Sequence, residues 1–194
     1  MTIAGFREKY EQNTEREMMN FKTLQWVGNE AGYLEIIDQT KLPGELVDIK
    51  CNSVEQLWNA IKMLAVRGAP AIGVAAGFGV VLASKEITDS QSIDDAIWHI
   101  KKQADYLGTS RPTAVNLFWA LDRMKAATER FQGKDIPSFK AMLLCEARLI
   151  CDEDVQMCKA IGVNGRDIIK SGDGILTHCN AGALATAGQG TALS

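Results

Sequence analysis

The residues best suited to chemistry lie near the carboxyl end of the chain, around Cys179. An apolar run over residues 174–176 leads into Thr177-His178-Cys179-Asn180, and small residues at helical spacing follow. This pattern predicts a strand, a tight turn and a helix, with Cys179 at the carboxyl end of the strand, where α/β sheets bind ligands beside helix N-termini. A cysteine there can serve as nucleophile, proton carrier or polar anchor, and a small buried cysteine at a strand end fits equally well.

Two arginines form a second candidate site, in Arg67-Gly68-Ala69-Pro70 and in Arg111-Pro112-Thr113. Because proline favours the first turn of a helix, each arginine is predicted to lie just before a helix, facing the positive end of its dipole. That placement is unfavourable unless an anion lies between the arginine and the helix start. A guanidinium group together with free backbone N–H groups binds phosphate or carboxylate. Each arginine alone also fits a surface ion pair. Since one of the two belongs to an apolar, glycine-containing segment, where a free charge is costly, the pair predicts a phosphate site.

The remaining histidines and cysteines give weaker signals. Neighbours on a strand point to opposite faces, so His178 and Cys179 are not expected to form a catalytic pair. His99, between Trp98 and Ile100, is expected to be a structural or surface histidine. No metal site is expected from the three cysteines of the long helix, which have no histidine near them: Cys145, Cys151 and Cys158.

The composition bounds the class of protein. The 194 residues are 46% apolar and 23% charged with a net charge of −3, which is typical of a soluble globular protein and argues against nucleic acid or an acidic membrane surface as partner. The longest apolar run, residues 69–83, is too short and too rich in alanine and glycine for a membrane span, so a buried helix is predicted. Five cysteines without a CxxC pair, and charges within residues 1–10 where a signal peptide would be apolar, predict free thiols and a cytoplasmic location.

Regular spacing predicts the elements that must position these residues. Alternation predicts an antiparallel meander over residues 24–27, 33–38 and 45–50. Helices are predicted after a capping box at Ser53, and over residues 69–82, 92–107, from 110–116 onward and 138–163. The apolar residues expected to face inward on the last of these are Met142, Leu149, Val155 and Ile161.

These elements predict an α/β protein in three parts. Residues 1–135 are expected to form an N-terminal domain of strands and helices, and residues 136–171 a connecting helix and linker. Residues 172–194 are expected to start a Rossmann-like, parallel-sheet domain. One strand and one helix make no sheet, and the chain stops without a helix-ending residue, so the chain is expected to be a fragment.

Motifs at residues 67–73, 110–116 and 177–182, together with residues 25–26 and 37–43, resemble the methylthioribose-1-phosphate isomerases of methionine salvage. This resemblance implies a fold shared with regulatory subunits of a eukaryotic translation initiation exchange factor and with other ribose-phosphate isomerases. It also implies a homodimer that needs neither metal nor nucleotide cofactor and that interconverts an aldose and a ketose sugar phosphate.

The same resemblance assigns site residues. Arg67, Gly68, Ala69 and Arg111 match positions that bind the substrate phosphate, and Cys179 matches the active-site cysteine. The general-acid aspartate and other substrate-binding residues are expected after residue 194, so the chain alone is predicted to be inactive. Three alternatives stay open: an isomerase for another ribose 1-phosphate, such as 5-deoxyribose 1-phosphate or ribose 1,5-bisphosphate; a non-catalytic regulatory subunit that binds a sugar phosphate or nucleotide; and a truncated product without function of its own.

Overall fold

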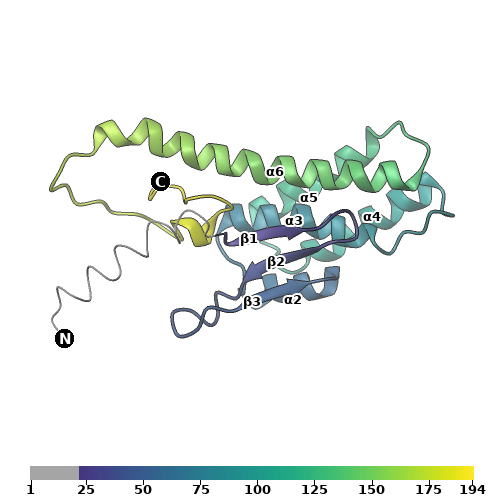
Figure 1. Ribbon diagram of the computed structural model, residues 1–194, viewed down its shortest axis with the longest axis horizontal. Coiled ribbons are helices and arrows are strands. Elements are labelled where there is room, and N and C mark those ends of the chain that lie inside the picture. Colours follow the sequence, from purple (N-terminus) through teal and green to yellow (C-terminus); the bar gives the residue numbers. More distant parts are fainter. Residues whose placement is uncertain (1–21) are drawn as a thin grey trace.

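The computed structural model describes residues 22–194, so the expectation for residues 1–10 lies outside it (Figure 1). A three-stranded antiparallel sheet comes first, in the order β1 (Leu24–Val27), β2 (Tyr33–Ile37) and β3 (Asp48–Cys51). Its register places Leu34 opposite both Trp26 and Cys51. The predicted meander is confirmed, with a third strand that begins three residues later than expected.

Five α-helices follow the sheet, and each was predicted from spacing. The cap predicted at Ser53 is also observed, because its side chain accepts from the backbone N–H of Gln56. Two short 3₁₀ helices lie near the end of the chain: η1 (Arg166–Ile168) and η2 (Ala183–Ala185). The α-helices are α2 (Val54–Lys62), α3 (Ala69–Ser84), α4 (Ile93–Gly108), α5 (Val115–Glu129) and α6 (Ile136–Gly165).

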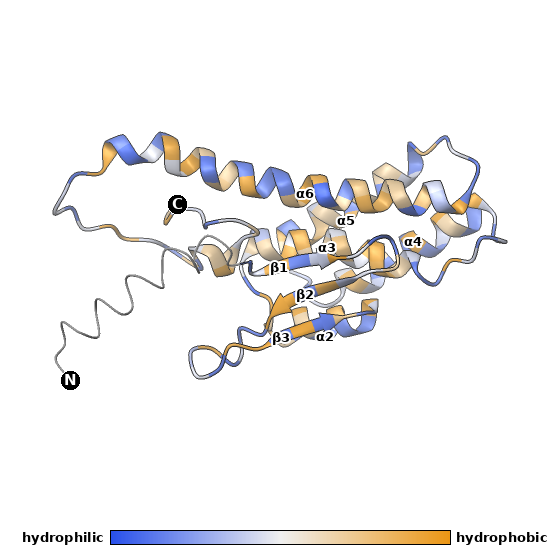
Figure 2. Cartoon of the chain, viewed as in Figure 1, coloured by the Kyte–Doolittle hydropathy of each residue, from blue (hydrophilic) through white to orange (hydrophobic). Residues whose placement is uncertain are grey.

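Helix α3 is the centre of the fold. It contacts α2, α4, α5, α6, β1, β2 and η2, and nearly all of its residues are buried, as predicted. Figure 2 shows it as an apolar element inside the molecule, whereas α6 carries hydrophilic and hydrophobic residues in alternation. Neighbours approach α3 closely at its glycines: a Cβ atom on Gly79 would lie 2.5 Å from a methyl carbon of Leu107. Small residues therefore let α3 be enclosed on all sides.

One face of helix α6 packs against α3 and α5 (Figure 1). The inward face predicted for it is wrong, since Leu149, Val155 and Ile161 are each about 40% exposed or more. Apolar residues occupy two faces of this helix, and sequence periodicity does not say which of them meets the core. The face that does so carries Leu143, Leu144, Ala147, Ile150 and Cys158.

Residues 169–182 form neither strand nor helix, so the strand and helix expected around Cys179 are not observed. Only η2 is helical there, with three residues. A parallel strand gains stability from ladder partners on a neighbouring strand, and among residues 22–194 no strand pairs with this segment. The local pattern alone does not fold the segment.

Three general properties of the described part bear on function. No helix within residues 22–194 has the length and apolar character needed to cross a membrane. Those residues also include no group of three or more His, Cys, Asp or Glu side chains placed to hold a metal ion. All five cysteines are free thiols.

Candidate anion-binding site

The start of α3 lacks the usual cap. Its N-cap residue is Gly68, with φ +98°, no side chain in the described chain accepts from the N–H groups of the first turn, and no acidic residue lies in that turn. Pro70 lies in the first turn, as predicted. By contrast, α2, α4 and α6 each begin with a side chain that caps them, from Ser53, Ser92 and Asp135. The first N–H groups of α3 are therefore left for another acceptor.

The start of α5 is open in the same way. Ala114 is its N-cap residue, and α5 has neither a side-chain cap nor an acidic residue in its first turn. The prediction that Pro112 lies inside this first turn is wrong. Residues 111–114 form a turn closed by the N–H of Ala114 on the carbonyl of Arg111, at 3.0 Å, and proline suits the second position of such a turn. Arg111 thus precedes α5 by one turn of chain.

The two open helix starts lie side by side. A Cβ atom on Gly73 would meet the carbonyl oxygen of Asn116 at 3.0 Å, so α3 and α5 touch near their first turns. A cavity of about 410 Å³ opens between these turns and α6. Its lining is mostly apolar, with Pro70, Gly73, Val74, Val115, Asn116, Trp119, Ile150, Glu153, Asp154 and Met157. Two aligned dipoles therefore point their positive ends at the same region.

Both predicted arginines lie at this end of the molecule without a carboxylate partner among residues 22–194. Arg67 is exposed, and its Nε donates to the Oε1 atom of Gln39 at 3.4 Å. Arg111 is half-buried. Arg123 shows the opposite state: it pairs with Glu146, at 2.6 Å, and with Glu153, and these bonds raise its pKa. Apart from the Nε of Arg67, the guanidinium donors of Arg67 and Arg111 are therefore available within the described chain to bind an anion.

Cys179 is exposed, and no hydrogen bond among the described residues joins it to either arginine. Its φ is +63°, in the left-handed region that residues other than glycine rarely adopt. Such backbone strain is frequent at functional sites. Within the described chain, the thiol is thus not bonded directly to either guanidinium group.

The segment after Cys179, residues 183–187, lies across the start of α3. Thr23 Oγ1 donates to the carbonyl of Ala183 at 2.6 Å, and Gln39 Nε2 donates to that of Leu184 at 2.8 Å. The N–H of Ala187 donates to Asp154 at 2.7 Å. A Cβ atom on Gly68 would lie 2.5 Å from the Cα atom of Ala185, so this contact needs glycine. The structure therefore joins the segment that follows the cysteine to the Arg67-Gly68-Ala69 motif.

Burial separates the thiols into two groups. It raises the pKa of Cys51 and of Cys151 to about 11, and it also raises the pKa of Cys158. Cys145 and Cys179 are exposed. Because the thiolate is the reactive form, the three shielded thiols are poor nucleophiles, and the exposed pair is where chemistry can occur.

Sequence reasoning missed three side chains that build this region: Thr23, Gln39 and Asp154. Gln39 is only 3% exposed and Thr23 2% exposed. Burial also raises the pKa of Asp154. Their partners lie 28 to 160 residues away along the chain, so no local spacing signals them. Only the position of Gln39 in the motif at residues 37–43 gave a hint.

Comparison with known families gives one match to most of the helical part. The model of the initiation factor 2 subunit family matches residues 65–192, which include both arginines and Cys179. Among curated proteins, the chain is 52% identical over 165 residues to the 5-deoxyribose 1-phosphate isomerase of Moorella thermoacetica, covering 84% of this chain and 46% of that protein. It is 47% identical over 161 residues to the methylthioribose-1-phosphate isomerase of Rhodopirellula baltica, covering 83% and 45%.

Solved structures show the same architecture. The delta subunit of translation initiation factor eIF-2B from A. fulgidus superposes with a TM-score of 0.78 at 41% identity, over 90% of this chain and 49% of that one. The 5-methylthioribose 1-phosphate isomerase of Pyrococcus horikoshii also gives 0.78, at 39% identity, over 87% and 46%. The chain spans about half the length of the curated relatives it matches.

Proposed function

Since this chain belongs to the initiation factor 2 subunit family, we propose that the full-length protein converts 5-methylthioribose 1-phosphate to 5-methylthioribulose 1-phosphate in methionine salvage. One observation carries this proposal: two uncapped helices start side by side, and each follows an arginine that has no carboxylate partner in the described chain. A dianionic phosphate supplies what that arrangement lacks.

The phosphate is held by residues of both helix starts. In this proposal Arg67 and Arg111 bind its oxygens, and Gly68 and Ala69 present backbone N–H groups to it. Gly68 suits this role because it supplies no capping side chain that would compete with the phosphate for the first N–H groups of α3. Binding the phosphate at one end fixes where the sugar carbons lie.

The chemistry then requires proton movements on the sugar. The phosphate ester blocks the anomeric carbon, so the ring opens when its oxygen is protonated and its bond to C1 breaks, which leaves an oxocarbenium at C1. Loss of the C2 proton then gives an enol with a double bond between C1 and C2. Return of a proton to C1 and loss of the C2 hydroxyl proton make C2 a carbonyl, and this last proton balances the one taken up by the ring oxygen. We assign Cys179 to the transfer at these carbons, which its exposed thiol permits. The general acid is a group outside residues 1–194.

A related substrate is the second candidate. A relative at 52% identity is named for 5-deoxyribose 1-phosphate, which differs from the methylthio sugar only at C5. A regulatory role without catalysis is a third candidate, favoured by the superposition on an initiation-factor subunit. The candidates separate in an assay with both sugar phosphates, because the regulatory subunit turns over neither.

The proposal also covers the domain to which residues 172–194 belong, the oligomeric state and the cellular location. Residues 172–194 open a Rossmann-like domain, a reading supported by the apolar run before Cys179 and by the family match over this part. The protein acts as a homodimer, and the exposed Trp119 and Met157 offer apolar surface for such contact. Five free thiols support a cytoplasmic location.

Replacement of the thiol tests the function. In the full-length protein, we expect Cys179→Ser to lower the turnover of 5-methylthioribose 1-phosphate by about 100-fold or more, because the hydroxyl is a poor substitute in proton transfer. Cys145→Ser is the matched control, since this thiol is also exposed but lies on α6. Wild-type turnover by Cys179→Ser would remove the assignment, and absence of turnover by the unmodified protein on either sugar phosphate would remove the function.

A further inference from the structure

We propose that Gln39 is a positioning residue, which couples the phosphate-binding Arg67 to the segment that follows Cys179. This inference rests on the proposed function. It concerns a side chain that binds no part of the substrate and acts through its two neighbours.

Gln39 is fixed between three parts of the chain. It follows β2 and is 3% exposed. Its backbone N–H donates to the carbonyl of Ala65 at 2.9 Å, which holds Gln39 beside the loop that leads into α3. Its side chain then reaches in two directions, donating from Nε2 to the carbonyl of Leu184 at 2.8 Å and accepting at Oε1 from Arg67 Nε at 3.4 Å.

The amide can point only one way. A guanidinium has donors and no acceptor, and a carbonyl oxygen accepts and does not donate. The Oε1 atom must therefore face Arg67 and the Nε2 group must face Leu184, because the flipped amide would lose both bonds. The partners thus lock the orientation of Gln39, and Gln39 in turn links the two partners.

This link has a functional consequence. Arg67 is otherwise exposed, so without Gln39 its guanidinium samples many positions, and ordering it on the phosphate costs entropy. Leu184 lies five residues after Cys179, and its carbonyl would lose its donor. One buried amide therefore fixes both the phosphate-binding guanidinium and the path of the segment that follows the thiol.

Thr23 provides a control within the same structure. Its hydroxyl donates to the carbonyl of Ala183, the residue next to Leu184, at 2.6 Å. Thr23 is equally buried but has no bond to Arg67. Loss of either side chain loosens residues 183–187, and only loss of the glutamine frees the arginine.

The test compares Gln39→Leu with Thr23→Val in the full-length protein. Gln39→Leu is expected to raise KM for the ribose 1-phosphate about 10-fold, and Thr23→Val to change KM less than about 2-fold, although both lower Tm. The double variant Gln39→Leu/Arg67→Ala is expected to have the KM of Arg67→Ala alone, because the two residues act as one unit. Additive effects on KM, or a wild-type KM in Gln39→Leu, would overturn the proposal.

A measurement without turnover separates this inference from the proposed function. Inorganic phosphate is expected to raise the Tm of the wild type and of Thr23→Val, and to raise it less in Gln39→Leu and Arg67→Ala. If the wild type turns over no ribose 1-phosphate but shows this pattern, the function fails and the positioning role stands. Equal phosphate responses in all four proteins, or none in the wild type, would overturn it. If Gln39→Leu does not fold, Gln39→Asn replaces it, with the same expected direction, because the shorter amide does not span both partners.

Discussion

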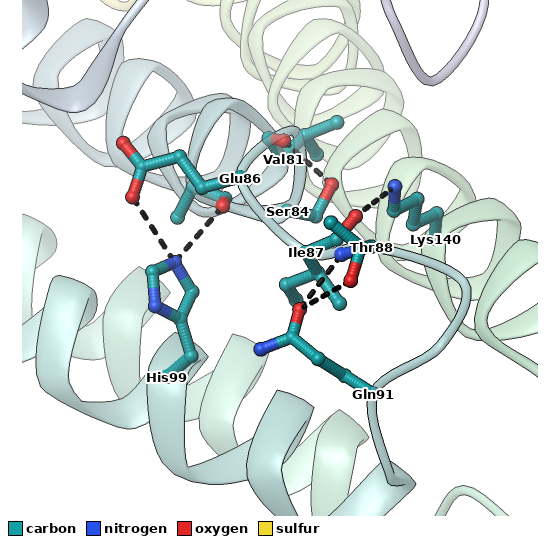
Figure 3. Close-up of polar contacts among 9 residues, drawn as sticks. Val81, Ser84, Glu86, Ile87, Thr88, Gln91, His99 and Lys140 are labelled. Atoms are coloured by element: carbon teal, nitrogen blue, oxygen red, sulfur yellow. Dashed lines mark hydrogen bonds and ion pairs between the residues drawn. The ribbon is translucent and has the colours of Figure 1, made fainter.

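The two ends of α3 solve the same electrostatic problem in opposite ways. At its carboxyl end the protein's own side chains bind backbone carbonyl groups of the last turn and of Ile87, three residues after the helix ends (Figure 3). His99 Nε2 lies 3.1 Å from the carbonyl of Ala83 and 3.4 Å from Glu86, and Lys140 Nζ donates to the carbonyl of Ile87 at 2.6 Å. The Lys140 ammonium group also places a positive charge near the negative end of the helix dipole, which stabilises the fold.

At the amino end of α3 nothing comparable is present in the described chain. Gly68 has no capping side chain, no acidic residue follows in the first turn, and Arg67 adds positive charge to the positive end. This arrangement is unfavourable in the absence of an anion. This difference between the two ends of α3 supports the proposed anion site at its amino end.

The largest effects are expected from replacing arginines, and three of them test the difference between the two ends of α3. Arg67→Ala and Arg111→Ala are each expected to raise KM roughly 10- to 150-fold, the effect of losing a charge-assisted contact of about 1.5 to 3 kcal/mol. Their Tm should change little, because neither has a carboxylate partner in the described chain. Arg123→Ala should do the reverse, with a loss of about 1 kcal/mol in the free energy of unfolding and a smaller change in KM, because Arg123 acts on the cavity only through its partner Glu153. Equal effects of all three on Tm would erase the contrast.

Removal of the Lys140 charge near the carboxyl end of α3 should lower the free energy of unfolding without changing substrate binding. Lys140→Met keeps most of the aliphatic side chain and loses the bond to the carbonyl of Ile87. We expect the free energy of unfolding, measured with urea, to fall by about 1 kcal/mol, while kcat and KM stay at wild-type values. A changed KM would mean that the two ends of α3 are not independent.

A capping side chain at the start of α5 should raise stability and weaken phosphate binding. Ala114 has the extended backbone of an N-cap, so Ala114→Asp places a carboxylate where it accepts from the first N–H groups of α5. The free energy of unfolding should rise by about 0.5 to 1 kcal/mol, and KM should rise about 2- to 5-fold, because the new charge competes with the phosphate. Ser53→Ala, which removes a cap from α2, should lower stability without changing KM. A stability gain in Ala114→Asp at unchanged KM would argue against an anion at α5.

The smallest effect concerns pH and Asp154, beside the open end. Burial raises the pKa of this carboxyl above its ordinary value of 3.8, so its charged form costs stability at neutral pH, and the cost disappears as pH falls through the raised pKa. Asp154→Asn removes the charge and keeps an oxygen for the N–H of Ala187. Its gain in Tm over the wild type should therefore be larger at neutral pH than near pH 3.8. A gain that does not vary with pH would show that the carboxyl charge costs nothing.

Much of the fold followed from local pattern. The meander, the capping box at Ser53 and the apolar helix α3 were predicted because alternation, capping chemistry and the absence of charge are properties of neighbouring residues. The prediction failed where two choices are locally equal: which face of α6 turns inward, and whether Pro112 lies in a helix or in the turn before it. The strand expected before Cys179 failed because a strand depends on partners elsewhere in the chain.

For the candidate site, the sequence by itself determined the chemistry, since guanidinium, glycine and thiol groups carry their properties wherever they lie. It placed Arg67, Arg111 and Cys179 as candidates. Only the tertiary structure decided that α3 and α5 start side by side, that residues 183–187 lie across Gly68, and that Gln39 joins them. These contacts join residues that are distant along the chain, and burial and hydrogen bonding fix them only when the whole core packs.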